Sequence, residues 1–144
     1  IPPSYIVNEV QKLDIYKRIA GIEDERECED MREELLDRFG EIPKSVENLL
    51  RIALIRSHAH RLYMPEVKGK NELVRFIMRT DASIRVENIP LLIGAYEGRM
   101  KFDPKGAPTF SLRYKKCGVI EKDEETLLAL TEGALAKMEE LFLS

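Results

Sequence analysis

The sequence has little of what disulfide-linked, metal-binding or membrane-spanning proteins rely on. Only two cysteines occur among its 144 residues, and tryptophan is missing. A secreted domain held by disulfides would normally carry more cysteines, so we expect Cys28 and Cys117 to be reduced thiols, buried or half-buried. No run approaches the roughly 18 apolar residues of a transmembrane helix, and no signal peptide opens the chain. We therefore expect a cytoplasmic protein without a membrane partner.

Groups that could form a catalytic or metal site are equally scarce. His58 and His60 are the only histidines, and side chains two residues apart on a helix diverge, so the pair cannot chelate one ion. We expect one histidine to pack between helices and the other to be solvated. Glycine-rich phosphate loops, dinucleotide fingerprints and the HExxH zinc motif do not occur in the sequence. The sequence thus predicts a domain that is not itself an enzyme and holds no metal or cofactor.

The charges nearly cancel, but they are unevenly distributed. The chain has 23 basic and 26 acidic residues and 44% hydrophobic residues, which excludes a disordered segment. Residues 1–63 hold 10 basic and 13 acidic groups, residues 64–120 hold 11 and 6, and residues 121–144 hold 2 and 7. We interpret residues 1–144 as one domain with a helical part, a sheet-forming part and a closing helix in these three regions. The first residue is Ile rather than Met, so we expect a fragment of a longer protein.

Apolar residues at helical spacing predict three helices in the first region, at about residues 8–20, 24–39 and 44–62. Asn8 is a good N-cap for the first helix, and its predicted apolar face contains Val10, Leu13 and Ile19. The second helix ends before Gly40, and its apolar stripe consists of Cys28, Met31, Leu35 and Phe39. In the third helix, two apolar stripes predict burial on two sides.

Alternating apolar residues predict strands at about residues 72–80 and 109–115. A short strand at residues 100–102, another at residues 83–86 and a short helix at residues 89–96 are weaker predictions. The last helix is predicted at residues 124–142, with Asp123 as its N-cap. The fold class is α+β: three helices, a small mixed or antiparallel sheet and a closing helix that share one core.

Four carboxylates of the second helix fall on the side opposite its apolar stripe: Asp30, Glu33, Glu34 and Asp37. Acids that share one environment do not separate their pKa values as catalytic pairs must. The stripe is either a solvated face or a docking surface for a basic partner. Since like charges at these spacings mildly destabilise a helix, a partner could offset that cost.

The excess of basic residues in the region 64–120 suggests nucleic-acid binding as an alternative function. We take Arg75, Arg79, Arg113 and Lys115 as possible phosphate contacts. The aromatic residues of this region fall on the apolar phase of the strands, which favours a role in the core over base stacking. The net charge of −3 also argues against a dedicated nucleic-acid binder.

Several segments resemble the C-terminal domain of bacterial transcription-repair coupling factor (Mfd). The resemblance rests on the opening residues Ile1, Pro2, Tyr5 and Ile6, on the Leu13-x-x-Tyr16-Lys17-Arg18-Ile19-Ala20 segment, and on the run EELLDRFGEIP at residues 33–43. It is specific over about residues 1–65, and beyond that it concerns only length and element order.

The resemblance implies a regulatory role. The family's full-length protein is an ATP-dependent translocase on double-stranded DNA that displaces stalled RNA polymerase and recruits the repair protein UvrA. ATP and Mg would be held by motor domains outside this chain. The resemblance further implies that the C-terminal domain docks on the N-terminal UvrB-like module of the same protein, masks its UvrA-binding surface and restrains translocation. The acidic contacts match Glu34 and Asp37, and Asp30 and Glu33 lie beside them.

Overall fold

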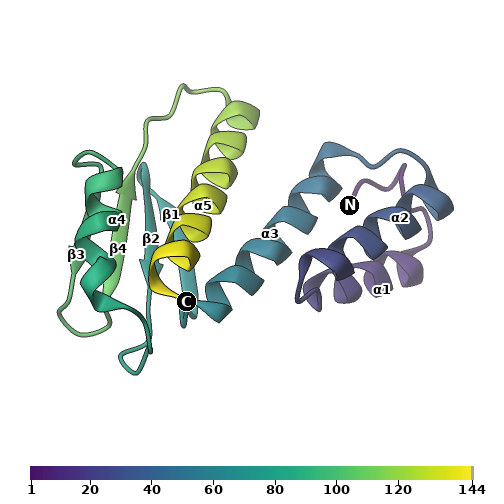
Figure 1. Cartoon of the computed structure of the whole chain (residues 1–144). Coiled ribbons are helices and arrows are strands. Elements are labelled where there is room, and N and C mark those ends of the chain that lie inside the picture. Colours follow the sequence, from purple (N-terminus) through teal and green to yellow (C-terminus); the bar gives the residue numbers. More distant parts are fainter. Residues whose placement is uncertain (144) are drawn as a thin grey trace. The chain divides into compact units, whose positions relative to one another are not determined.

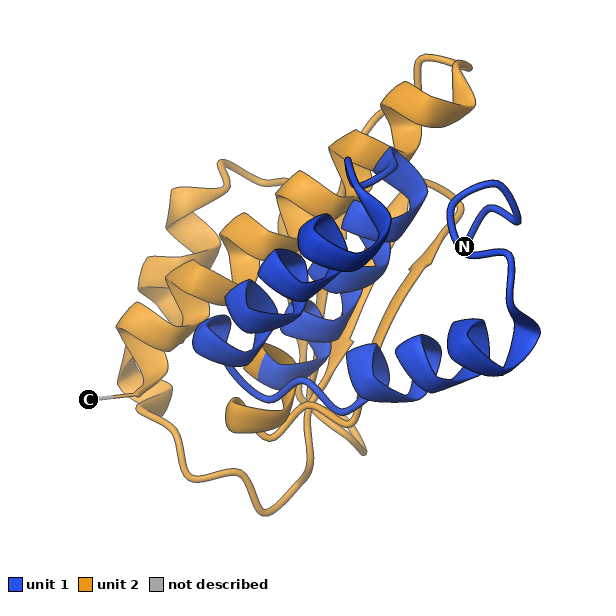
Figure 2. Cartoon of the chain, turned by 90° about the vertical axis from the view of Figure 1, so that its right-hand side faces the viewer, with its two compact units in different colours: residues 1–57 blue, residues 58–144 orange. Residues whose placement is uncertain are grey.

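The computed structural model describes residues 1–143 and confirms the α+β class. The described residues form five α-helices and a four-stranded antiparallel sheet (Figure 1). Three helices come first, two pairs of strands follow with a short helix between them, and the longest helix comes last. Residues 1–57 and 58–144 form two compact units (Figure 2), and the boundary lies close to the predicted change from helical to sheet-forming sequence. Each unit buries apolar residues of its own. The expectation of one domain with a common core stays a prediction.

The first unit contains α1 (Glu9–Ala20), α2 (Glu25–Phe39) and most of α3 (Lys44–Arg61). The Asn8 side chain accepts hydrogen bonds from the backbone N–H groups of Val10 and Gln11, and so caps α1 as predicted. Asp24 caps α2 in the same way through the N–H of Glu27. The core of the unit consists of buried residues from all three helices and the segments beside them: Ile6, Ile15, Ile19, Ile22, Cys28, Met31, Leu35, Val46, Leu50 and Ala53.

The predicted apolar face of α1 is partly wrong. Val10 and Leu13 are 78% and 56% exposed, whereas Ile15 and Ile19 are buried. Ile15 and Ile19 are four residues apart and therefore share one face of the helix, and that face is the one packed into the core. Ile52 of α3 is likewise 40% exposed, so one of the two predicted stripes of α3 is incomplete.

The second unit is built on an antiparallel sheet with the order β1-β2-β4-β3. Its strands are β1 (Glu66–Lys70), β2 (Leu73–Ile77), β3 (Met100–Asp103) and β4 (Thr109–Arg113). The strand β1 was not predicted. It joins β2 through Asn71 and Glu72, both at positive φ, as a two-residue type I′ hairpin requires.

One face of this sheet is buried. Val74, Phe76, Phe110 and Leu112 point to it and are at most 1% exposed. The long helix α5 (Ile120–Phe142) contributes Phe142, whose ring centroid lies 5.6 Å from that of Phe110. The short helix α4 (Ile89–Ala95) contacts β3 and α5 and buries Leu92.

Two local predictions in the second unit are wrong. Helix α5 starts at Ile120 rather than Glu124, so Asp123 lies in its first turn, where its carboxylate accepts hydrogen bonds from the N–H groups of Cys117 and Gly118. Residues 83–85 form no strand, and Val86–Asn88 is a 3₁₀ turn. That turn is fastened to the end of α5, because the Asn88 amide donates to the carbonyl of Leu141 at 2.6 Å. Across residues 1–143, no helix has the length and apolar character to span a membrane.

Candidate functional site

The acidic face of α2 presents three unpaired carboxylates. Asp30, Glu33 and Asp37 are exposed, and within residues 1–143 none of them forms an ion pair. They lie three, four and seven residues apart, so they occupy one side of the helix, opposite the buried Cys28 and Leu35. The structure therefore brings these three predicted site residues together on a face that is open to water.

Glu34 differs from its three neighbours because the first unit already supplies its partners. Both its carboxylate oxygens accept from the guanidinium of Arg18 on α1, at 2.5 and 2.6 Å, and Oε2 also accepts from Arg38 at 2.8 Å. These hydrogen bonds, to Arg18 first and then to Arg38, lower the pKa of Glu34 to about 2. Its side chain is 32% exposed. The predicted stripe of four equivalent carboxylates is thus three free groups beside a fourth that ties α1 to α2.

A second ion pair fixes α2 from its other side. Arg32 donates to both carboxylate oxygens of Glu47 on α3, at 2.6 and 3.0 Å. The bonds to Glu47 raise the pKa of Arg32. Because α2 is held to α1 through Glu34 and to α3 through Glu47, the direction in which Asp30, Glu33 and Asp37 point is set by the fold of the unit.

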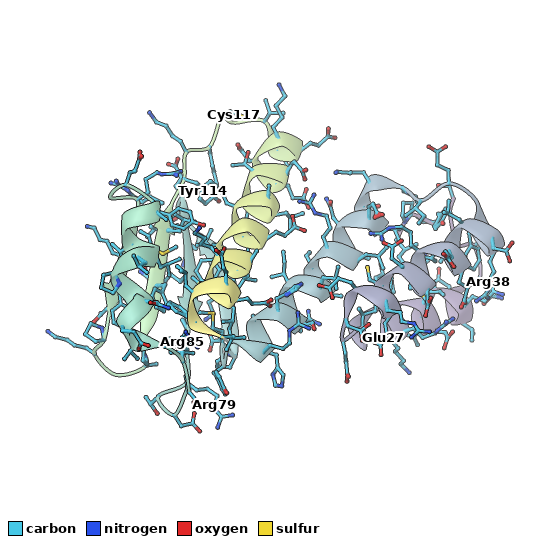
Figure 3. All side chains as sticks on the ribbon, in the orientation of Figure 1. Glu27, Arg38, Arg79, Arg85, Tyr114 and Cys117 are labelled. Atoms are coloured by element: carbon cyan, nitrogen blue, oxygen red, sulfur yellow. The ribbon has the colours of Figure 1, made fainter. Side chains whose placement is uncertain are left out.

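The four predicted phosphate contacts divide into two groups. Arg75 of β2 and Arg113 of β4 lie on the sheet face opposite the buried one, and both are exposed. We call this the outward face of the sheet. Arg79 lies beyond β2 in a loop, where it forms a two-point ion pair with Asp81 at 2.8 and 2.9 Å. Figure 3 shows Arg79 at one end of the sheet and Tyr114 toward the other. Lys115 follows Tyr114 in the segment after β4 and is exposed.

The sheet adds three cations to this face that were not among the predicted sites, Lys68, Lys70 and Lys101. Lys68 of β1 lies directly opposite Arg75, and Lys101 of β3 lies directly opposite Ser111, the partner of Arg75 on β4. The sequence of β1 has no alternation of apolar residues, so it did not predict a strand. The position of Lys68 beside Arg75 follows only from the pairing of β1 with β2. Two shallow hollows of about 320 and 430 Å³ lie on this face, the first beside Lys68 and Arg75 and the second beside Lys101 and Arg113.

The histidines are placed as predicted. His58 is half-buried near the end of α3, and its Nδ1 lies 2.5 Å from a carboxylate oxygen of Glu139 on α5, to which Arg61 also donates. His60 is exposed. Among residues 1–143, no three His, Cys, Asp or Glu residues are arranged to hold a metal ion.

Both cysteines are free, but they differ in environment. Cys28 is buried, and burial raises the pKa of its thiol. Cys117 is exposed in the loop between β4 and α5 (Figure 3), so the expectation of burial is wrong for this residue. Residues 115–122 around it are all exposed, so this loop gives Cys117 no core to enter.

The similar proteins described below are transcription-repair coupling factors. The model of the TRCF domain matches residues 1–89, which extends beyond the 65 residues that carry the resemblance in sequence. The transcription-repair-coupling factor of Borreliella burgdorferi is 31% identical over 125 residues, which cover 87% of this chain and 11% of that protein. The factor of Bacillus subtilis is 32% identical over 100 residues, which cover 69% of this chain and 8% of that protein.

A solved structure shows the same fold. The crystal structure of a C-terminal domain of transcription-repair coupling factor superposes with a TM-score of 0.74 at 24% identity, covering 97% of this chain and 88% of that one. The chain spans only about a tenth of the length of the curated relatives, which come from bacteria. Since the family model covers more than half of the chain, the chain belongs to the TRCF domain family of transcription-repair coupling factors.

Proposed function

We propose that this chain is a non-enzymatic regulatory domain of a cytoplasmic, ATP-dependent DNA translocase that couples transcription to nucleotide-excision repair. In the resting protein it docks on the N-terminal UvrB-like module and masks the surface that binds UvrA. Contact with RNA polymerase, translocation on DNA, and the binding of ATP and Mg belong to other parts of the full-length protein. The observation that carries this proposal is the group of exposed, unpaired carboxylates on α2: Asp30, Glu33 and Asp37.

These carboxylates have the properties of a reversible docking surface. Three negative charges on one side of a helix repel one another, and a basic partner surface would relieve that repulsion. An exposed ion pair contributes only about 0–1 kcal/mol, so a contact of three such pairs can be displaced by a modest competing interaction. A ligand shifts such an equilibrium whenever it binds the undocked state better than the docked state.

We infer unequal roles for Glu34 and Asp37, the two residues that the resemblance singles out. Asp37 is exposed and unpaired within residues 1–143, so it is available to a partner. Glu34 is bound by Arg18 and Arg38, so a partner cation would have to share or displace these. We therefore take Asp37, with Glu33 and Asp30, as the direct contacts, and Glu34 as the residue that holds α2 in position.

The test is charge reversal of the free carboxylates in the full-length protein. Glu33→Lys with Asp37→Lys should leave the fold intact, because neither side chain has an ion-pair partner to lose within residues 1–143. The variant should bind UvrA more tightly than the wild type by about tenfold, which corresponds to about 1.4 kcal/mol of lost docking energy. UvrA affinity is measured by titration in the absence of polymerase.

The control carries the same change of charge away from this face. Glu41→Lys with Glu97→Lys alters two exposed acids in loops, and its UvrA affinity should equal that of the wild type. Equal UvrA affinity in all three proteins would refute masking by α2. Equal increases in both variants would show a general effect of charge and would refute it as well. Reversal of Glu34 is not a suitable test, because it would also disrupt the contact between α1 and α2.

A further inference from the structure

The outward face of the sheet carries a grid of positive charge. One register row crosses all four strands as Lys68, Arg75, Ser111 and Lys101, and the next row contains Lys70, Leu73 and Arg113. All five of these cationic residues are exposed. Adjacent strands lie about 4.8 Å apart and alternate residues about 7 Å apart, so the grid measures about 14 by 7 Å. Acidic residues on outward positions, Glu66 and Asp103, are confined to the row at the opposite end.

Most of these cations have no anionic partner. Lys68 forms an ion pair with Glu66 at 2.9 Å, but within residues 1–143 no ion pair involves Lys70, Arg75, Lys101 or Arg113. Lys68 stands directly opposite Arg75, and like charges in directly opposed positions destabilise a sheet. Within the described chain, most cations of this face therefore have no counter-charge, and a bound anion would stabilise the face.

We propose that this face binds the phosphate backbone of double-stranded nucleic acid without reading its sequence. A duplex carries one phosphate of each strand for about every 3.4 Å of helix axis, so a row of about 14 Å along the axis corresponds to about four base-pair steps. The hollows beside Arg75 and Arg113 are open to solvent and both arginines are exposed, so phosphate oxygens can reach the guanidinium groups. Arginine and lysine side chains of this kind position a protein on the backbone but carry no information on the bases.

The composition of the face separates a duplex from other polyanions. Proteins that bind single strands combine cations with aromatic side chains on which bases stack. The outward positions of the four strands contain no aromatic residue, since Phe76 and Phe110 lie on the inner face. Phe102 pairs with Phe110 and also lines the second hollow, but a single ring is no platform on which successive bases could stack. An acidic peptide in a groove would need apolar anchoring sites, and the outward face offers only the half-buried Leu73 and Ile77. The phosphate backbone of a duplex requires neither stacking nor apolar pockets, so it fits this face best.

The experiment measures binding of a labelled duplex of random sequence to the 144-residue protein by fluorescence anisotropy at several salt concentrations. About five phosphate contacts predict a slope of log K against log salt near −4.5, equivalent to a loss of about 500-fold in affinity between about 50 and 200 mM salt. Two duplexes of different sequence should bind equally. The variant Arg75→Gln with Lys101→Gln should lower the magnitude of the slope by about 2, because each lost phosphate contact removes about one unit.

The matched control removes two lysines from α5, which packs on the inner face. Lys122→Gln with Lys137→Gln changes the net charge equally and should leave the slope unchanged. Circular dichroism verifies that both variants fold. The proposal is overturned if the duplex does not bind at low salt, if both variants change the slope equally, or if a single strand or poly-glutamate binds more tightly than the duplex. It does not depend on docking by α2, because its variants and its readout involve neither that helix nor UvrA.

Discussion

Removing the charge of Glu34 should destabilise the first unit in a way that depends on pH. The Glu34 carboxylate joins α1 to α2 through two hydrogen bonds to Arg18, and a third bond from Arg38 adds to it. Glu34→Gln keeps the size of the side chain but removes the charge and leaves at most one oxygen to accept. The substitution therefore isolates the charge-assisted part of this contact.

The pKa of Glu34 sets the magnitude and the sign of the effect. Its pKa falls from 4.5 to about 2, chiefly because of the bonds to Arg18 and then Arg38. A shift of this size in a buried group would correspond to about 3 kcal/mol. The Glu34 carboxylate is 32% exposed and Arg18 is 42% exposed, so water screens the pair and we expect about 1 kcal/mol. Because the folded-state pKa lies below the unfolded one, this stabilisation is fully present above about pH 5 and is lost as the pH falls from about 4.5 to 2.

The assay is urea denaturation of the wild type and of Glu34→Gln, followed by far-UV circular dichroism at pH values from neutral to strongly acidic. The free energy of unfolding should differ by about 1 kcal/mol at pH 7, and the difference should disappear toward pH 2. Glu33→Gln is the matched control, since Glu33 is an exposed carboxylate on the same helix without an ion pair in residues 1–143. A difference that does not change with pH, or an equal loss in Glu33→Gln, would refute the assignment of the stabilisation to the Arg18–Glu34–Arg38 contact.

Two further predictions concern a thiol and a turn. An aromatic disulfide reagent should label Cys117 within seconds in the native protein and Cys28 only after unfolding, because Cys117 is exposed and Cys28 is buried; equal labelling rates would contradict this. Gly40 has φ 87° and ψ −159°, a conformation that is open almost only to glycine. Gly40→Ala should therefore cost about 1–3 kcal/mol of unfolding free energy from backbone strain alone, since a Cβ there meets no atom within 4 Å. Gly21→Ala, at φ −90°, is the control and should change stability by less than about 0.5 kcal/mol.

Local signals in the sequence were sufficient for the helix ends and the central strands. Asn8 predicted the start of α1 because its side chain satisfies N–H groups that no helical bond can reach. Apolar residues at helical spacing and the following Gly40 predicted the bounds of α2. Phe76 and Phe110 predicted β2 and β4 because alternation with polar residues indicates a sheet with one buried face. In each case the determining interaction lies within a few residues of the signal.

Predictions failed where the determining contact is distant in sequence. The strand β1 has the sequence EVKGK, in which only Val67 is even half-buried, so its existence depends on pairing with β2. The residue pair Asn71-Glu72 carried a weak signal, because Asn is favoured in type I′ turns. In α1, the periodicity left open which apolar residues face the core, and packing in the unit selected Ile15 over Leu13.

The candidate site was predicted incompletely for the same reason. Helical spacing grouped Glu34 with Asp30, Glu33 and Asp37, but it could not show that Arg18, sixteen residues away, would bind Glu34. Likewise, the sequence indicated Arg75 and Arg113 as cations of one region, but their alignment with Lys68 and Lys101 follows from the register of four strands.

The ion pairs within the first unit show by contrast which charged residues lack a partner in the fold. Where this fold joins two helices through a carboxylate, it supplies the cation: Arg18 and Arg38 for Glu34, and Arg32 for Glu47. Asp37 received no such partner within residues 1–143, and neither did Arg75 on the sheet. Unpaired like charges cost stability in a helix and in a sheet alike, so neither group is explained by the folding of its own unit. Opposite signs require different partners, a basic protein surface for α2 and a polyanion for the sheet. Reversal at Asp37 should therefore alter UvrA binding without changing the salt dependence of duplex binding, and neutralisation of Arg75 should do the reverse.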